Sequence, residues 1–238
     1  MTSALASQPA AGTVAARAEE VTKIYGTGEA AVRALDNISV EFATGRYTAI
    51  MGPSGSGKST LLHCLAGLDS VTAGRIMLGD IDISACSEKQ LTVIRRDKIG
   101  FVFQSYNLIP TLNAIENITL PLALAGKKPE RRWLNRVIAT VGLADRLNHR
   151  PSELSGGQQQ RVAVARALAS RPEVIFADEP TGNLDSDSAE EVMQLIVRLN
   201  QDNRQTFVLV THAREVAARA GRTIRMRDGE IAAVVDSE

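Results

Sequence analysis

The chain has 238 residues, 44% of them hydrophobic, which is enough for one large α/β domain with a packed core. Its 27 Lys and Arg residues balance its 27 Asp and Glu residues, so the formal net charge is zero. This balance argues against a dedicated nucleic-acid binder, which is visibly basic. No run of about 18 apolar residues is present, so no membrane-spanning helix is predicted.

The start of the chain and its cysteines indicate the compartment. Residues 1–13 are rich in Ala and Ser and lack a basic segment followed by an apolar one, so we predict a disordered start and no signal peptide. Cys64 and Cys86 have no paired or metal-ligand spacing. They are interpreted as reduced thiols of a cytoplasmic protein, without a disulfide or zinc.

The first third of the chain predicts an antiparallel β element joined to an α/β core. Alternating apolar residues and turn signals predict strands and a helix, in order: strands at 14–24, 38–42 and 47–51, a helix at 61–66, and a hairpin at 74–83. Gly79 and Asp80 are predicted at the turn of this hairpin.

The rest of the chain alternates helices with apolar strands. The predicted elements are a strand at 99–103, helical segments at 113–124 and 130–142, a helix at 159–170, a strand at 174–177, a helix at 188–200, a strand at 206–210 and a hairpin at 224–234. The short apolar strands predict a mostly parallel sheet buried on both faces. Residues 105–160 are interpreted as an inserted α-helical subdomain, in which Trp133 is a packing residue.

A glycine-rich loop between the strand at 47–51 and the helix at 61–66 matches a phosphate-binding P-loop. Its residues are Gly52, Pro53, Ser54, Gly55, Ser56, Gly57, Lys58, Ser59 and Thr60. The glycines let backbone N–H groups turn toward an anion, and the helix directs its positive dipole end to the same place. Lys58 is predicted to reach the β- and γ-phosphates of a nucleotide, and the Ser59 hydroxyl to ligate Mg²⁺.

Two adjacent carboxylates end the strand at 174–177. Asp178 suits a Mg²⁺ site reached through water, and Glu179 suits a base for the water that attacks the γ-phosphate. The alternative is a capping Asp and a first-turn Glu of a following helix, with Pro180 at its start.

A second candidate anion site lies far along the chain from the P-loop. Ser155 suits a helix cap, Gly156 and Gly157 expose backbone N–H groups, and Gln158 follows. Two half-sites for one phosphate group predict that two chains complete each other. The alternative is an ordinary capped helix start.

Taken together, the motifs resemble the ATP-binding subunit of ABC transporters over nearly the whole chain, about residues 14–235. The motifs occur in the family's order: the P-loop, the Q-loop at Gln104, the signature at 154–158, the Walker B strand at 174–179, the D-loop at 183–185 and a switch histidine at His212. Tyr25 matches the aromatic residue that stacks on adenine in this family. The resemblance implies a single ABC-type ATPase domain at residues 14–238.

The family's mechanism is implied for the matching residues. Two copies form a head-to-tail homodimer with ATP between the P-loop of one and the signature of the other. Gln104 joins Ser59 and Asp178 around Mg²⁺, His212 contacts the γ-phosphate, and Asp185 contacts the opposite chain. A groove near Gln104 would receive a coupling helix of the membrane partner.

A narrower resemblance rests on residues 21–26, 32–35 and 103–112. These look like the lipoprotein-release, macrolide-efflux (MacB), haem-efflux and FtsE-type ATPases. In that subgroup the partner is an integral membrane permease with four transmembrane helices, of the MacB/FtsX type. The resemblance implies a peripheral protein on the cytoplasmic face of the cell membrane, which drives export or extraction from the membrane. Residues 106–112 are predicted either to contact this partner or to pack the helical subdomain.

Three alternatives stay open. An FtsE-like ATPase would regulate its membrane partner without transport. A soluble ABC ATPase of DNA repair or translation is opposed by the zero charge, by the absence of coiled-coil heptads and by the single ATPase unit. A nucleotide-binding regulator without hydrolysis is opposed by the presence of both Glu179 and His212.

Overall fold

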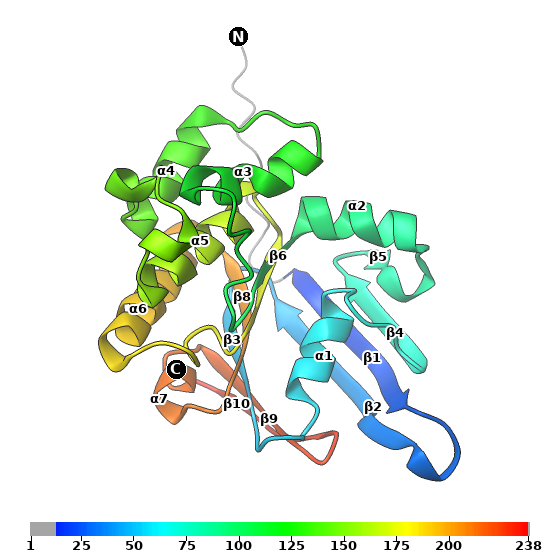
Figure 1. The fold of residues 1–238 in the computed structure, drawn as a ribbon. Coiled ribbons are helices and arrows are strands. Elements are labelled where there is room, and N and C mark those ends of the chain that lie inside the picture. Colours follow the sequence, from blue (N-terminus) through cyan, green and yellow to red (C-terminus); the bar gives the residue numbers. More distant parts are fainter. Residues whose placement is uncertain (1–12, 238) are drawn as a thin grey trace.

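A computed structural model describes residues 13–237, so the prediction for residues 1–13 lies outside the described part except at Thr13. Within that part the strands form two sheets (Figure 1). The first is antiparallel, in the order β2-β1-β4-β5, with β1 (Val14–Tyr25), β2 (Val32–Ala43), β4 (Ala73–Leu78) and β5 (Ile81–Asp82). Leu78 pairs with Ile81 across the predicted Gly79-Asp80 turn, which confirms this hairpin.

The second sheet has six strands in the order β10-β9-β3-β8-β7-β6. They are β3 (Tyr47–Met51), β6 (Ile99–Val102), β7 (Val174–Asp178), β8 (Thr206–Thr211), β9 (Arg222–Arg227) and β10 (Glu230–Asp236). All neighbours pair in parallel except β9 and β10, which form the predicted terminal hairpin. The mostly parallel core and the antiparallel β element are therefore confirmed.

Helices lie on both sides of the six-stranded sheet (Figure 1). They are α1 (Lys58–Leu65), α2 (Glu88–Lys98), α3 (Ala114–Leu124), α4 (Arg131–Val141), α5 (Gly156–Ala169), α6 (Ser186–Asn203) and α7 (Arg214–Ala217). Short 3₁₀ turns occupy Gly28–Ala30, Ile83–Ala85, Ala144–Arg146 and Pro151–Glu153. No helix within residues 13–237 is both long and apolar enough to cross a membrane.

Alternate residues of the central strands supply two hydrophobic cores. Phe207 and Leu209 of β8 pack in a core with α3, α4, α5 and α6, whereas Val208 and Val210 pack in a second core with α1 and the antiparallel sheet. This alternation follows from the two-residue repeat of a strand. Because both faces are covered, the polar side chains that end β7 and β8 are held at one rigid edge, beside the loop that follows β3.

Trp133 of α4 is a packing residue, as predicted. Its ring nitrogen donates to the backbone oxygen of Leu168 at 3.0 Å, and the Arg171 guanidinium lies 4.9 Å from its ring centre. These contacts tie α4 to the end of α5. They satisfy the polar end of an aromatic side chain that is otherwise packed against the core.

Candidate nucleotide-binding site

The loop between β3 and α1 has little room for side chains. Gly57 caps α1 with φ 92°, in the left-handed region that favours glycine. A Cβ atom on Gly57 would lie 2.3 Å from the backbone oxygen of Ala34, and one on Gly52 would lie 2.2 Å from that of Met226. Glycine is therefore required at both positions, because β2 and β9 approach the loop closely.

Lys58, the first residue of α1, folds back onto this loop. Its Nζ donates to the backbone oxygen of Pro53 at 2.7 Å, and the residue is only 7% exposed. Burial lowers the pKa of Lys58, and the carboxylates of Glu179 and Asp178 oppose this shift. The ammonium is thus held at the loop by one carbonyl, a partner that phosphate oxygens can replace.

Ser59 and Asp178 meet where the start of α1 faces the end of β7. The Ser59 Oγ donates to the Asp178 Oδ1 at 3.0 Å. His63, which the sequence analysis did not single out, lies 3.6 Å from the other carboxylate oxygen through its Nε2. The available signal was spacing, because His63 follows Ser59 by four residues and so lies on the same face of the helix.

Glu179 and His212 form the second contact at this edge. The His212 Nδ1 lies 3.0 Å from the Glu179 Oε2, and the Glu179 backbone N–H donates to the oxygen of Val210 at 3.0 Å. Glu179 has φ 43°, a left-handed conformation that is uncommon outside glycine. The strained turn directs the carboxylate away from the strand and toward His212.

Asp178 does not cap a helix. It is the last residue of β7, and the next helix, α6, starts only at Ser186 with Asp185 as its cap. The alternative interpretation of the two carboxylates as a helix start is therefore wrong.

These groups surround one open pocket of about 670 Å³. It is lined by Val32, Arg33, Ala34, Ser54, Gly55, Gly57, Lys58, Ser59, Thr60, Glu179 and His212. The structure thus places the P-loop beside the side chains that end β7 and β8. Residues 32–34 were not predicted to line the site. They reach it because β2 begins next to the P-loop.

Tyr25 lies at the end of β1, and its surroundings are polar. Its hydroxyl donates to the Asp69 Oδ2 at 2.6 Å, while the Lys23 Nζ lies 4.8 Å from the ring centre and 2.6 Å from the Asp69 Oδ1. Tyr25 is 41% exposed. The Lys23 ammonium therefore contacts the Tyr25 ring, and the exposed surface of the ring leaves room for a flat group to stack on it.

The segment at 154–158 forms a complete capping box at the start of α5. The Gln158 N–H donates to the Ser155 Oγ at 3.3 Å, and the Ser155 N–H donates to the Gln158 Oε1 at 3.0 Å. The capped helix start is thus present, and it explains Ser155 and Gln158 together.

Close packing explains why residues 156 and 157 are both glycines. A Cβ atom on Gly156 would lie 3.0 Å from the Tyr106 hydroxyl, and one on Gly157 would lie 2.9 Å from the side chain of Ser188. Asp185 caps α6 by accepting from the Ser188 N–H at 3.0 Å, a hydrogen bond that lowers the pKa of Asp185. The signature segment therefore packs against the start of α6 within one chain.

The predicted residues fall into two groups. Lys58, Ser59, Glu179 and His212 line the pocket. Asp178 accepts a hydrogen bond from Ser59, one of these lining residues. The pocket is not lined by Tyr25, Gln104, Asp185 or the signature residues. The carboxamide of Gln104 instead pairs with that of Asn183, with 3.1 Å between the Gln104 Nε2 and the Asn183 Oδ1.

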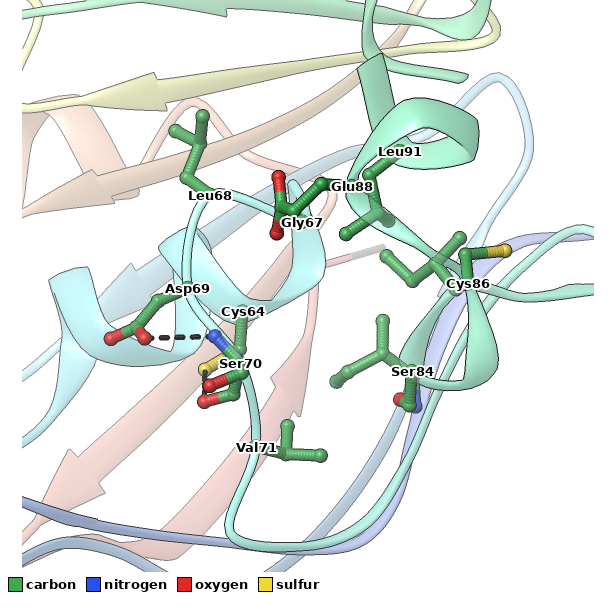
Figure 2. A pocket seen from close by; sticks show the side chains of 12 residues that line it. Cys64, Gly67, Leu68, Asp69, Ser70, Val71, Ser84, Cys86, Glu88 and Leu91 are labelled. Carbon is green, nitrogen blue, oxygen red and sulfur yellow. Dashed lines mark hydrogen bonds between the residues drawn. The ribbon is translucent and has the colours of Figure 1, made fainter. Parts of the chain in front are cut away.

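A separate pocket of about 340 Å³ lies between the end of α1 and the start of α2 (Figure 2). Cys64 and Cys86 both line it, and both are free, as predicted. Burial raises the pKa of Cys64 to about 12, so this thiol stays protonated at neutral pH. Neither Asp178 nor Glu179 lines this pocket, and no Lys or Arg side chain lines it either.

The residues suit a hard divalent cation. No cluster of three or more His, Cys, Asp and Glu side chains occurs within residues 13–237. The Ser59 hydroxyl and the Asp178 carboxylate nevertheless supply two oxygen donors beside the phosphate-binding loop. Mg²⁺ takes few protein ligands of this kind and completes its shell with phosphate and water oxygens.

A P-loop between a parallel strand and a helix, with carboxylates at the end of a nearby strand, defines a P-loop nucleotide-binding fold. The sequence matches the ABC transporter family over residues 35–182. The chain belongs to that family, as one of its ATPase cassettes.

Individual relatives support this assignment. The chain is 50% identical over 214 residues to an uncharacterized ABC transporter ATP-binding protein of Thermotoga maritima, which covers 89% of this chain and 91% of that protein. It is 48% identical over 223 residues to the macrolide export ATP-binding/permease protein MacB of Brucella melitensis. That match covers 93% of this chain but spans only 34% of MacB.

A solved structure has the same fold. It is the dimeric, post-hydrolysis state of the ATP-binding cassette MJ0796 bound to ADP and Pi, with a TM-score of 0.84 and 44% identity. The match covers 93% of this chain and 98% of that one. MJ0796 is a protein of Methanocaldococcus jannaschii.

Proposed function

We propose that the chain hydrolyses ATP with Mg²⁺ in the P-loop pocket and so drives a separate membrane permease. The observation that carries this proposal is the meeting of two contacts at one edge of the sheet, Ser59 with Asp178 and Glu179 with His212. Ser59 and Asp178 supply oxygen ligands for a cation. Glu179 supplies a carboxylate that the His212 imidazole holds in place. Both contacts lie beside the loop that suits phosphate.

In this proposal each group has one task. Lys58 leaves the backbone oxygen of Pro53 for the β- and γ-phosphates, and Ser59 and Asp178 hold Mg²⁺, which neutralises phosphate charge when bound. Glu179 takes a proton from the attacking water, while His212 holds that carboxylate and contacts the γ-phosphate. Gln104 adds an oxygen ligand to the cation, and Tyr25 stacks on adenine.

The substitution Glu179→Gln tests the hydrolysis. It keeps the size of the side chain but removes the base, so ATP turnover is expected to fall by about 10²- to 10⁴-fold while ATP binding is retained. Turnover is measured by phosphate release, and binding by a fluorescent nucleotide. The matched substitution Glu41→Gln lies at an exposed position of β2 outside the pocket and is expected to keep full activity. Rapid turnover in Glu179→Gln contradicts the proposed role.

We infer a head-to-tail homodimer from the separation of the two half-sites. The signature residues do not line the pocket of their own chain, and MJ0796 is dimeric. The backbone N–H groups at Gly156 and Gly157, with the Ser155 hydroxyl, would then contact the γ-phosphate of ATP held by the other copy. Asp185 would contact the opposite chain.

The permease is proposed to dock on a groove beside β6 and α3. This groove of about 350 Å³ is lined by Arg95, Arg96, Ile99, Gly100, Phe101, Phe103, Asn107, Leu120, Pro121, Leu124, Arg166, Ala167 and Ser170. Leu124 is 76% exposed, and the groove lies close to Gln104 along the chain. We propose that residues 105–160 act as a helical subdomain of the 14–238 domain and move with this contact.

MacB is the relative that supports a specific partner class, because it joins a similar cassette to a permease in one chain. We propose that the partner here is a separate permease of the MacB/FtsX type, with the cassette on the cytoplasmic face of the membrane and export or extraction as the outcome.

Co-purification identifies the partner. Tagged Glu179→Gln is expressed in the native host, and membranes are solubilised with ATP present. An integral membrane protein with four transmembrane helices and a large extracytoplasmic domain is the expected partner. Recovery of ribosomes, DNA or only soluble protein contradicts the transporter proposal.

A further inference from the structure

Asn183, in the turn before α6, directs three polar groups at the segment that starts with Gln104. Its Nδ2 donates to the backbone oxygen of Gln104 at 3.2 Å, and its Oδ1 accepts from the Gln104 Nε2 at 3.1 Å. Its backbone oxygen accepts from the Tyr106 hydroxyl at 3.4 Å. Residues 79 positions apart are thus joined by a reciprocal pair of hydrogen bonds.

The orientation of both carboxamides follows from one backbone carbonyl. A carbonyl oxygen only accepts, so the group of Asn183 that faces the Gln104 backbone oxygen must be its NH₂. The Asn183 Oδ1 then lies on the other side and needs a donor. The Gln104 side chain supplies one only through its Nε2. Neither amide can flip without placing two donors or two acceptors against each other.

The consequence is that the Gln104 Oε1 stays available. Among residues 13–237 it accepts no hydrogen bond, and Gln104 is exposed. Gly182 leaves the space for this arrangement, because a Cβ atom there would lie 2.6 Å from the Gln104 Nε2. An exposed carboxamide oxygen of fixed orientation is the kind of ligand that Mg²⁺ accepts.

We propose that Asn183 is a positioning residue that holds the Gln104 carboxamide so that its Oε1, and not its Nε2, faces the Mg²⁺ of bound ATP. The proposal rests on the proposed role of Gln104 as a cation ligand. Asn183 itself touches neither ATP nor Mg²⁺ in this scheme and acts only through Gln104. Residues that orient a metal ligand in this way typically change metal affinity about 10- to 100-fold when they are replaced.

Cation binding, measured without turnover, tests the proposal. In the full chain carrying Glu179→Gln, with saturating ATP, free Mn²⁺ is measured by its EPR signal as a probe for the Mg²⁺ site. Asn183→Ala is expected to weaken Mn²⁺ binding about 10-fold and to leave metal-free ATP binding unchanged. Asn183 is exposed, so its removal opens no cavity. Asn148→Ala, another exposed asparagine, is the matched control and is expected to bind Mn²⁺ normally.

The double variant Gln104→Ala with Asn183→Ala separates the possible roles. If Asn183 acts through Gln104, the double variant binds Mn²⁺ no more weakly than Gln104→Ala alone. Additive losses would mean an independent effect of Asn183 and would overturn the proposal. Normal Mn²⁺ binding in Asn183→Ala, with weakened binding in Gln104→Ala, would overturn it as well. Normal binding in Gln104→Ala would instead remove Gln104 from the proposed cation site.

Discussion

At the scale of single residues, Asp69 joins the surroundings of Tyr25 to the end of α1. It accepts from the Tyr25 hydroxyl and from the Lys23 ammonium, each at 2.6 Å. Lys23 is only 7% exposed. Burial raises the pKa of Asp69, and the hydrogen bonds from Lys23 and Tyr25 lower it. The lowering is larger, so the pKa of Asp69 is below its usual value. The ionised carboxylate therefore compensates a buried cation next to the proposed adenine contact.

Asp69→Asn is expected to destabilise the protein by about 2 kcal/mol at pH 7, because hydrogen bonds to a charged group are lost. A carboxylate with a lowered pKa stabilises the fold above the unfolded pKa of about 3.9, and this contribution is lost as the pH falls through the folded pKa. Urea unfolding at several pH values measures the difference between wild type and variant. The difference is expected to shrink below about pH 4.

Asp80→Asn is the control for this comparison, because Asp80 is exposed in the β4–β5 turn. It is expected to leave stability within about 0.5 kcal/mol of wild type. A pH-independent loss in Asp69→Asn would show that packing, and not the charge of the carboxylate, sets its contribution.

The proximity of several candidate site residues could be predicted from the sequence, whereas the contact of His63 could not. Ser59, Asp178, Glu179 and His212 follow strands or open a helix, and parallel strands bring their carboxyl ends to one edge, so their proximity could be anticipated. His63 was missed because a histidine within an apolar helix segment has no motif of its own. Its contact with Asp178 depends on how α1 faces β7, which is a tertiary property.

At the scale of elements, the signature segment depends on the absence of a side chain at Gly157. Gly157→Ala is expected to destabilise the protein by about 1–3 kcal/mol, because the added Cβ would lie 2.9 Å from the side chain of Ser188 on α6. Thermal unfolding measures the loss. Gly221→Ala is the matched control, since a Cβ there would meet nothing closer than 3.5 Å.

Removing the opposing side chain tests the cause of that loss. Ser188→Gly in the Gly157→Ala background is expected to recover part of the stability, although glycine near the start of α6 itself costs up to about 1 kcal/mol. No recovery relative to the two single variants would indicate that the substitution disturbs α5 and not its contact with α6.

The guanidinium of Arg166 supports the segment after Gln104. Arg166 of α5 donates to the backbone oxygens of Tyr106 at 2.8 Å and Asn107 at 2.5 Å, and these two residues have φ values of 59° and 49°. Burial lowers the pKa of Arg166, yet an arginine stays charged at neutral pH. The fork of the guanidinium thus supports two consecutive residues in an uncommon conformation.

Arg166→Lys is expected to loosen this segment, because an ammonium cannot reach both carbonyls with the planar geometry of a guanidinium. Hydrogen–deuterium exchange of peptides covering residues 104–112 is expected to become faster, while exchange in β7 and β8 stays unchanged. Arg198→Lys on the exposed face of α6 is the control and is expected to leave this segment protected. Unchanged exchange in Arg166→Lys would contradict the supporting role.

Element boundaries differ from prediction where local signals conflict. β2 starts at Val32, whereas the sequence predicted a start at Ile38. The prediction missed the first part of the strand because Asp36 and Asn37 interrupt its apolar alternation. Asn37 has φ 48°, and the pairing with β1 shifts around it, so these turn-forming residues form an irregularity within a strand. α2 was missed because none of its residues is fully buried, although Ser87 and Gln90 form a capping box that marks its start.

At the scale of the whole molecule, the proposed dimer makes ATP a part of the interface. With ATP, the Glu179→Gln variant is expected to shift from monomer to dimer in size-exclusion chromatography with light scattering, because the bridging γ-phosphate is not cleaved. With ADP it is expected to stay monomeric. Lys58→Ala, which removes the phosphate contact, is expected to stay monomeric with either nucleotide. A monomer of Glu179→Gln at saturating ATP would contradict the shared-site proposal.

The strand order of the six-stranded sheet also bears on how the chain is made. Among the described residues, β3, which precedes the P-loop, pairs only with β8 and β9, which lie near the other end of the chain. During synthesis, β3 therefore leaves the ribosome long before either neighbour exists. At about 5–20 residues per second, this interval lasts on the order of ten seconds. During this interval the apolar residues of β3 have no partner strand, and we expect chaperones to bind the nascent chain there.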